Sequence, residues 1–182
     1  MGRPYQPSLL RLLHGGTALL VAAAWLSGLL VYLSADGRGL SQRWREVVQG
    51  VSSQLGDDWI DIHGSIGVAL LPLAVLLALY ALTLGKARLR QASNSLPLVA
   101  LTAAIGSGKL MDEDWLREGT LQHPVYSVHL IAWLLVAISV TVHLGAALVR
   151  GGPALLRSML SLRLRPGDLP GQWWQQIQGI WR

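Results

Sequence analysis

Two histidines, at positions 129 and 143, lie fourteen residues apart inside one apolar stretch of the chain. Fourteen residues of α-helix rise ~21 Å, and the two side chains end only about 40° apart around the helix axis. An imidazole inside hydrocarbon is costly and is rarely left without a partner. The spacing therefore indicates one helix that holds a ligand at two depths, and iron porphyrin is the candidate ligand.

The composition is that of a membrane protein. The chain has 182 residues, of which 52% are hydrophobic and 14% charged, and its mean hydropathy is +0.41. Soluble domains carry about 25% charged residues. The chain has no cysteine, which excludes disulfides, iron–sulfur ligation and covalent haem attachment through C-x-x-C-H. Phosphate-binding glycine loops and H-E-x-x-H are absent too, and nucleic acid is not an expected partner despite the net charge of +5.

Four apolar segments can position these histidines, at about 8–33, 59–84, 91–111 and 124–150. The first, second and fourth exceed the ~20 residues needed to cross a bilayer. The third is strongly apolar only over 96–105, and a re-entrant or surface segment is its alternative. The first could also be read as a cleaved signal peptide, but it is long for one and contains Arg11 and His14. We expect an all-α fold, a transmembrane four-helix bundle.

The basic residues give the orientation. With four spans, one side carries ten Lys and Arg and a single acid, and the other carries five Lys and Arg and nine acids. Because basic loops stay in the cytoplasm, both termini are expected there, in a bacterial cytoplasmic or other energy-transducing membrane. The ten are Arg3, Arg11, Lys86, Arg88, Arg90, Arg150, Arg157, Arg163, Arg165 and Arg182, and the acid is Asp168.

The topology places the histidines at matched depths. His14 falls near the inner end of the first span and His63 at the outer start of the second, while the fourth span brings His129 to the outer level and His143 to the inner level. Two pairs result, His14 with His143 and His63 with His129. Two haems with imidazole nitrogen on both axial positions would satisfy all four residues.

Neighbouring residues suit that use without proving it. Gly15, Gly16, Gly64 and Gly67 follow the first two histidines and leave room for a flat macrocycle, although glycines also allow close helix packing. Arg11 and Arg150 lie within two turns of the inner pair and are candidate partners of haem propionates. Their alternative role is to anchor the span ends among lipid headgroups.

The histidine-bearing stretches resemble the bacterial cytochrome b561 family. They are RLLHGGTALL at 11–20, HGSIGVALLPL at 63–73 and HLIAWLLVAISVTVHLGAALV at 129–149, followed by ALLRSML at 154–160. The resemblance covers roughly residues 8–160 and implies two non-covalent, bis-histidine haem b groups at His14, His63, His129 and His143. It also implies electron transfer between the quinone pool and a partner. The polar third span and the Gly-Gly after His14 depart from the family pattern.

The predicted function is a di-haem b-type membrane cytochrome that carries electrons between quinone or quinol and an unidentified redox protein, with quinol oxidoreductase activity left open. One alternative is the cytochrome b membrane anchor of a larger dehydrogenase or hydrogenase, and another is a haem-free membrane scaffold. Membrane lipids are expected contacts, and a homodimer is left open. Carboxylates lie almost wholly in the outer loops, so no proton relay crosses the membrane.

Two further segments lie outside the spans. Apolar residues recur at helical spacing over 40–55 in the first outer loop, which predicts a short helix on the membrane surface. Gly151-Gly152-Pro153 should break the last span and separate a haem-binding domain, 1–150, from an amphipathic, Trp-rich cytoplasmic tail, 151–182. We expect that tail to anchor at the interface, with docking to a partner as the alternative. His123, before Pro124, should cap the fourth span rather than bind iron.

Overall fold

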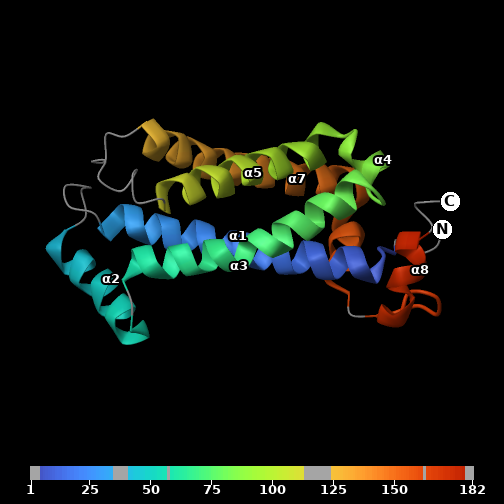
Figure 1. Ribbon diagram of the computed structural model, residues 1–182, viewed down its shortest axis with the longest axis horizontal. Coiled ribbons are helices and arrows are strands. Elements are labelled where there is room, and N and C mark those ends of the chain that lie inside the picture. The colour runs from blue at the N-terminus through green and yellow to red at the C-terminus, as the bar shows by residue number, and fades with distance from the viewer. Residues whose placement is uncertain (1–4, 35–40, 57, 113–123, 162, 179–182) are drawn as a thin grey trace. The chain divides into compact units, whose positions relative to one another are not determined.

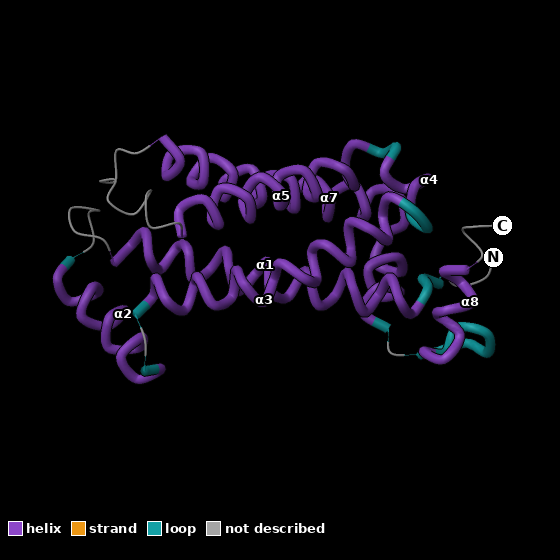
Figure 2. Tube along the Cα trace, in the orientation of Figure 1, coloured by secondary structure: helices purple, strands orange, loops and turns teal. Residues whose placement is uncertain are grey.

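The computed structural model is all-helical over the residues that it describes, 5–34, 41–56, 58–112, 124–161 and 163–178. The long helices are α1 (Ser8–Ser34), α3 (Trp59–Leu82), α5 (Ala92–Asp112) and α7 (Pro124–Leu160). Shorter elements are α2 (Gln42–Leu55), α4 (Lys86–Leu89), the 3-10 turn η1 (Pro170–Gln172) and α8 (Trp173–Gln178). In Figure 2 most of the described residues are helical, with a few loops and turns, and no strand is drawn among them. The predicted all-α class is confirmed, and the four apolar segments match the long helices to within two residues, apart from the extension of α7.

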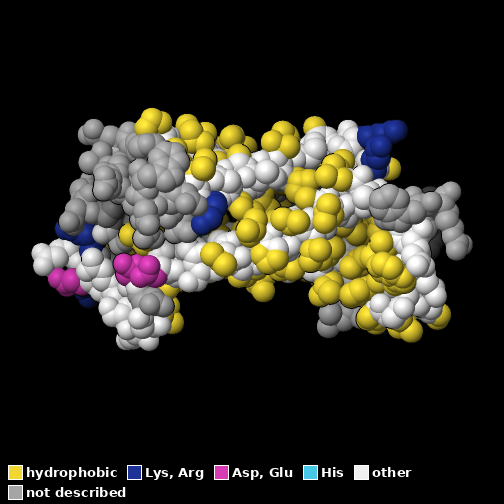
Figure 3. Space-filling model, viewed as in Figure 1, with side chains coloured by type: hydrophobic (Ala, Val, Ile, Leu, Met, Phe, Trp, Pro, Cys, Tyr) yellow, Lys and Arg dark blue, Asp and Glu magenta, His cyan; other side chains and the backbone are white. Residues whose placement is uncertain are grey.

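Three of the described helices, α1, α3 and α7, are long and apolar enough to cross a membrane. Their side chains are largely outward-facing, as Leu19 (72% exposed) and Val68 (73% exposed) illustrate. Figure 3 shows hydrophobic side chains covering much of the visible helical surface. Large apolar side chains in this number are stable only against lipid or another apolar surface. The α5 helix is not among the three, so its crossing remains a prediction.

Local sequence explains where the helices begin and end. The Asp58 carboxylate accepts the backbone N–H groups of Ile60 (2.8 Å) and Asp61 (2.9 Å) and so caps α3. The α2 helix ends at Gly56, whose φ of 86° is the left-handed conformation that terminates helices. The α7 helix is interrupted at Gly152 (φ 60°, ψ −167°), within the predicted Gly-Gly-Pro break. The α2 helix confirms the predicted helix in the first loop.

The chain forms two compact units. The first unit comprises Met1–Thr17 and Leu73–Arg182, and the second comprises Ala18–Pro72. In the first unit, α5 lies along α7 (Figure 1). Their buried residues are mainly small, Ala100 on α5 and Ala132, Val136 and Ser139 on α7. Small side chains allow two helix backbones to approach closely.

In the second unit, α2 carries exposed apolar side chains along its length, at Trp44, Val47, Val51 and Leu55. Trp59, the first residue of α3, donates its indole N–H to the Val48 carbonyl of α2 (2.8 Å) and so fixes α2 to the start of α3. The acidic side chains visible in Figure 3 lie at this α2 end of the unit. An amphipathic helix of this kind is suited to lie on a bilayer surface, as the sequence predicts.

Candidate functional site

The first unit brings His14 of α1 and His143 of α7 together. The centres of their imidazole rings lie 6.0 Å apart, and the ring planes are inclined by 37°. The two residues are 129 positions apart in the chain, and both side chains are partly buried. The sequence predicted this pair from depth alone. The structure thus places two imidazole rings close to each other within one unit.

The spacing fits one metal ion between the rings. A bond of about 2 Å from metal to imidazole nitrogen, plus about 1.1 Å from that nitrogen to the ring centre, gives roughly 6 Å between ring centres when counted on both sides. Among the described residues, no three His, Cys, Asp or Glu side chains gather into a metal site. A metal held by two imidazoles alone would need its remaining ligands from a non-protein group. Iron porphyrin supplies four such nitrogens and leaves two axial positions.

One of the two ring nitrogens of His143, Nδ1, already has a hydrogen-bond partner in the protein. Its Nδ1 lies 2.9 Å from the main-chain carbonyl oxygen of Ser93, at the start of α5. A carbonyl oxygen only accepts, so Nδ1 carries the proton and Nε2 keeps its lone pair for a metal. Donation of the second N–H to a carbonyl is the usual way in which a ligating histidine is oriented.

Arg150 holds the segment that orients His143. Its guanidinium donates to the Gln91 side-chain oxygen and to the Ser93 hydroxyl, and its Nε donates to the Ala146 carbonyl (3.0 Å). Arg150 was predicted to reach a haem propionate. Its described contacts instead join α7, just before the Gly152 break, to Gln91 and Ser93 at the start of α5.

His129, also on α7, has a comparable arrangement. Its Nδ1 lies 3.1 Å from the Ala104 carbonyl oxygen and 3.1 Å from the Ser107 hydroxyl oxygen, both on α5. The ring also lies against Gly108, where an added Cβ would come within 3.1 Å of the imidazole Cε1. Glycine at 108 therefore lets the ring approach α5.

His63 is held in the second unit by Ser27 of α1. Its Nδ1 lies 2.9 Å from the Ser27 hydroxyl oxygen, and that hydroxyl donates to the Ala24 carbonyl at 3.1 Å. Because the hydroxyl proton goes to the carbonyl, the serine oxygen accepts from Nδ1. Ser27 is only 3% exposed, so this contact is sheltered from water. The predicted partner of His63, His129, belongs to the first unit, and their pairing remains a prediction.

A short pattern in the sequence repeats at these two serines. Ala-x-x-Ser occurs at 24–27 and at 104–107, and in both places the serine hydroxyl donates to the alanine carbonyl and contacts a histidine Nδ1. Sequence reasoning missed both serines. A small polar residue three positions after alanine in an apolar helix was the available signal, but only the structure shows which histidine each serine meets.

Arg11 is directed toward the tail of the chain. Its guanidinium donates to the main-chain carbonyls of Ser161 and Arg163, the second at 2.9 Å, and the side chain is only 7% exposed. Its Nε is buried without a hydrogen-bond partner among the described residues. Arg11 therefore fastens the chain after α7 to the first turn of α1, three residues before His14.

Asp168, the single acid that the sequence predicts on the side with ten basic residues, completes that attachment. Its buried carboxylate accepts the Tyr5 hydroxyl, the Ser8 backbone N–H (2.7 Å) and the Ser8 hydroxyl (3.0 Å). Trp173 donates its indole N–H to the same Ser8 hydroxyl at 2.8 Å. Burial and the hydrogen bond to Asp168 raise the pKa of the Tyr5 hydroxyl above 10.0. We call Tyr5, Ser8, Arg11, Asp168 and Trp173 the tail clasp. Sequence reasoning missed the tail clasp, and the isolated acid at position 168 was the available signal.

The predicted glycines divide into two kinds. A Cβ at Gly15, Gly64 or Gly67 would meet nothing within 4 Å, whereas a Cβ at Gly16 would come within 3.2 Å of the Leu73 side chain. The open positions leave space beside His14 and His63, as a macrocycle requires, and Gly16 serves helix packing. His123 lies outside the described residues.

Comparison with known proteins supplies the family. The family model described as prokaryotic cytochrome b561 matches residues 5–162. No curated protein and no solved structure matches the chain. The match covers all the predicted ligands, and the chain belongs to the prokaryotic cytochrome b561 family. It is therefore an integral membrane cytochrome that binds haem b and takes part in electron transport.

Proposed function

We propose that this cytochrome holds two haem b groups, one between His14 and His143 and one between His63 and His129, and carries electrons between quinol or quinone and a redox protein. The observation that carries the proposal is the closeness of the His14 and His143 rings, whose centres lie 6.0 Å apart. Bound haem supplies one-electron chemistry at iron. With imidazole on both axial positions, the iron is suited to electron transfer rather than to oxygen binding.

The hydrogen bonds of the other histidines support the same assignment. His63, His129 and His143 each have Nδ1 in contact with a protein oxygen, which is the kind of contact that orients a ligating imidazole. Three imidazoles held in the same way support a role as ligands. The protein thus holds the rings in place before the haem binds.

Arg11 and Arg150 are assigned to positioning in this proposal. Their guanidinium groups already donate to protein oxygens, Arg11 to the tail and Arg150 to Gln91 and Ser93 at the start of α5. These contacts favour a third role, in which each arginine joins two parts of the chain, over contact with haem propionates or with lipid headgroups. Arg11 holds the start of α1 below His14, and Arg150 holds the Ser93 segment against His143.

The membrane arrangement is part of the proposal. We take α5 as a fourth crossing because it packs along α7 and exposes Leu96 (51%) and Val99 (65%) on its outer side. With four crossings, the side that carries ten Lys and Arg residues and both termini faces the cytoplasm, in a bacterial cytoplasmic or other energy-transducing membrane. The His14–His143 haem then lies toward the cytoplasm and the His63–His129 haem toward the opposite side.

Haem spectra of single-histidine variants test the proposal. His63→Ala should remove one haem and spare the other in a reduced-minus-oxidised spectrum, and His123→Ala is the matched control that should keep both. Loss of no haem in His63→Ala would refute the pairing. Quinol added to purified protein without other subunits should reduce the haems. Failure of that step, with both haems present, would favour a membrane anchor that receives electrons from a catalytic subunit.

A further inference from the structure

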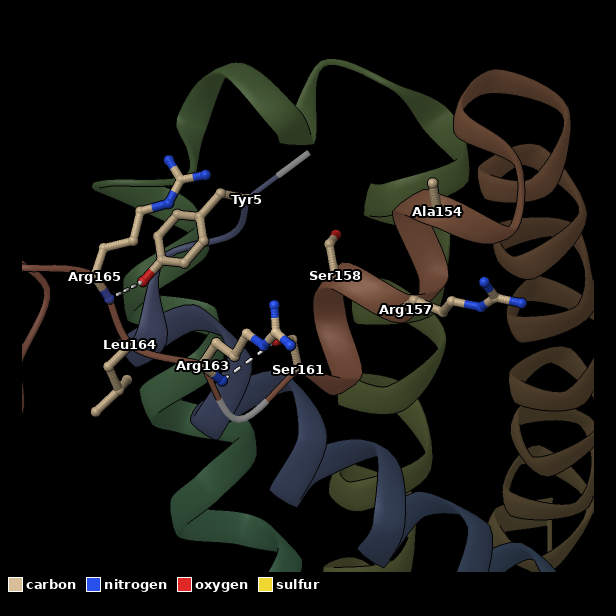
Figure 4. Close-up of a pocket in the computed structure, with 8 residues that line it drawn as sticks. All are labelled: Tyr5, Ala154, Arg157, Ser158, Ser161, Arg163, Leu164 and Arg165. Atoms are coloured by element: carbon tan, nitrogen blue, oxygen red, sulfur yellow. Dashed lines mark hydrogen bonds between the residues drawn. The ribbon is translucent and has the colours of Figure 1, made fainter. Parts of the chain in front are cut away.

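We propose that the tail after α7 forms a binding site for the phosphate of an anionic phospholipid. The first unit contains a cavity of about 620 Å³ beside the tail clasp, lined by Tyr5, Ser158 and Leu164 and by the arginines Arg157, Arg163 and Arg165. Figure 4 shows the cavity residues coming from the start of the chain, the end of α7 and the segment after it. This site is distinct from the histidines and does not depend on the number of haems.

The charge of the cavity is strongly positive. Three of its eight lining residues are arginines, and none of the eight is acidic. Arg157, Arg163 and Arg165 form no ion pair with the described carboxylates, and Asp168 is already used by Tyr5 and Ser8. Guanidinium groups bind phosphate through paired, charge-assisted hydrogen bonds. A phosphate ester is therefore the ligand chemistry that the cavity fits.

Part of the site is held in place before any ligand binds. The Arg165 guanidinium lies over the Tyr5 ring, 4.0 Å from the ring centre, and the Arg165 backbone N–H donates to the Tyr5 hydroxyl at 3.3 Å. The Arg163 backbone N–H donates to the Ser161 hydroxyl at 3.2 Å. In Figure 4 the Arg163 side chain extends toward Ser158 and Ser161, while Arg157 extends from α7 away from Tyr5. The backbone is thus fixed, and the Arg157 and Arg163 side chains are exposed.

The surroundings favour a lipid over free phosphate. The cavity lies at the end of α7, a helix able to cross the membrane, so it falls at headgroup level if α7 spans the bilayer. Leu160 (80% exposed) and Leu164 (47% exposed) neighbour the arginines in the sequence, and their side chains can pack against the acyl chains of a lipid. A volume of about 620 Å³ is also within the range of organic-ligand pockets and exceeds the needs of an inorganic phosphate. We commit to an anionic phospholipid.

Lipid titration of the purified, haem-loaded full chain tests the site. After delipidation in detergent, phosphatidylglycerol, phosphatidylcholine and inorganic phosphate are added separately, and bound ligand is counted by native mass spectrometry. We expect one tightly held phosphatidylglycerol, bound at least about tenfold better than phosphatidylcholine. Equal binding of the two lipids overturns the proposal. Displacement of phosphatidylglycerol by inorganic phosphate at equal concentration overturns the choice of a lipid and leaves a phosphate site.

A charge-matched pair of variants localises the binding. Arg157→Gln with Arg163→Gln removes two exposed guanidinium groups and should weaken phosphatidylglycerol binding by about tenfold or more. Arg88→Gln with Arg90→Gln removes two exposed arginines outside the cavity and should leave binding unchanged. If both double variants lost phosphatidylglycerol binding equally, the effect of the arginines would be diffuse electrostatic attraction, and the proposed site would be wrong. Haem content reports folding of each variant, and the lipid comparison on the unaltered protein decides the question if one fails to fold.

Discussion

His143 and His63 are oriented by different kinds of acceptor. His143 donates to the main-chain carbonyl of Ser93, whereas His63 meets the side-chain hydroxyl of Ser27 beside the main-chain carbonyl of Ala24. A main-chain carbonyl is kept when its residue is substituted, whereas Ser27→Ala removes the hydroxyl. The two histidines also differ in what surrounds their helices: the unit of His143 contains the tail clasp, and the unit of His63 contains α2. The contact of His143 is therefore independent of the side chain at position 93, and the contacts of His63 depend in part on the side chain at position 27.

The largest expected effect comes from the ligands themselves. His14→Ala and His143→Ala should each remove the same haem, so the double variant should lose no more than either single variant. The reason is that one iron needs both imidazoles, which makes the two losses non-additive. Haem content and the redox spectrum of the three variants measure this. If the double variant lost a second haem, the two histidines would belong to different sites.

The tail clasp should matter next. Asp168→Ala leaves the Tyr5 hydroxyl and the Ser8 donors without their acceptor, which costs about 2–3 kcal/mol of stability. We expect a lower thermal midpoint and partial loss of the haem at His14, with the haem at His63 retained. Asp61→Ala, an exposed carboxylate of α3, is the control and should change neither. An unchanged midpoint in Asp168→Ala would show that the clasp contributes nothing to stability.

Serine substitutions test the two kinds of acceptor directly. Ser27→Ala deletes the hydroxyl that contacts His63 and should weaken haem retention at that site by roughly tenfold, the usual effect of losing an outer-shell partner. Ser93→Ala keeps the carbonyl that His143 uses and should leave its haem unchanged. Ser107→Ala should have an effect similar to that of Ser27→Ala, since the Ala104 carbonyl stays 3.1 Å from His129 just as the Ala24 carbonyl stays beside His63.

The haem dissociation rates of the three serine variants measure these effects. Ser139→Ala is the matched control, because Ser139 is a buried serine of α7 whose hydroxyl donates to the Val136 carbonyl at 3.0 Å and contacts no histidine. Equal rates for Ser27→Ala and Ser93→Ala would contradict the distinction between side-chain and main-chain acceptors.

The smallest effect is the response of the clasp to alkali. The folded protein raises the pKa of Tyr5 above its ordinary value of 10.0, so the neutral phenol stabilises the fold. That contribution is complete below about pH 10 and is lost as the pH rises through the folded pKa. The thermal midpoint of Tyr5→Phe should therefore lie below that of the unaltered chain near neutral pH, and the gap should narrow above about pH 10. If the difference in thermal midpoint between Tyr5→Phe and the unaltered chain stayed constant with pH, titration of Tyr5 would be excluded as a source of stability.

Much of the fold and part of the site could be predicted from the sequence. Hydrophobic length located α1, α3 and α7, and histidine spacing with the basic-residue count predicted the meeting of His14 and His143 across 129 positions. These features follow from bilayer thickness and helix rise, which are fixed by physics rather than by the details of packing.

Contacts between distant side chains could not be predicted. Nothing in the order of residues shows that Asp168 accepts Tyr5 and Ser8 some 160 positions earlier, or that Arg11 donates to carbonyls after α7. Such contacts depend on the path of the tail, which the Gly152 break redirects by an amount that composition does not encode. The two serines beside His63 and His129 were missed for the same reason.

The most direct measurement is the haem content of the purified, unaltered chain, determined as the ratio of haem b to protein. Four imidazoles arranged as two axial pairs predict two haems per chain, both low-spin and six-coordinate. A ratio of one would contradict the account, because it would leave one pair of histidines without a metal.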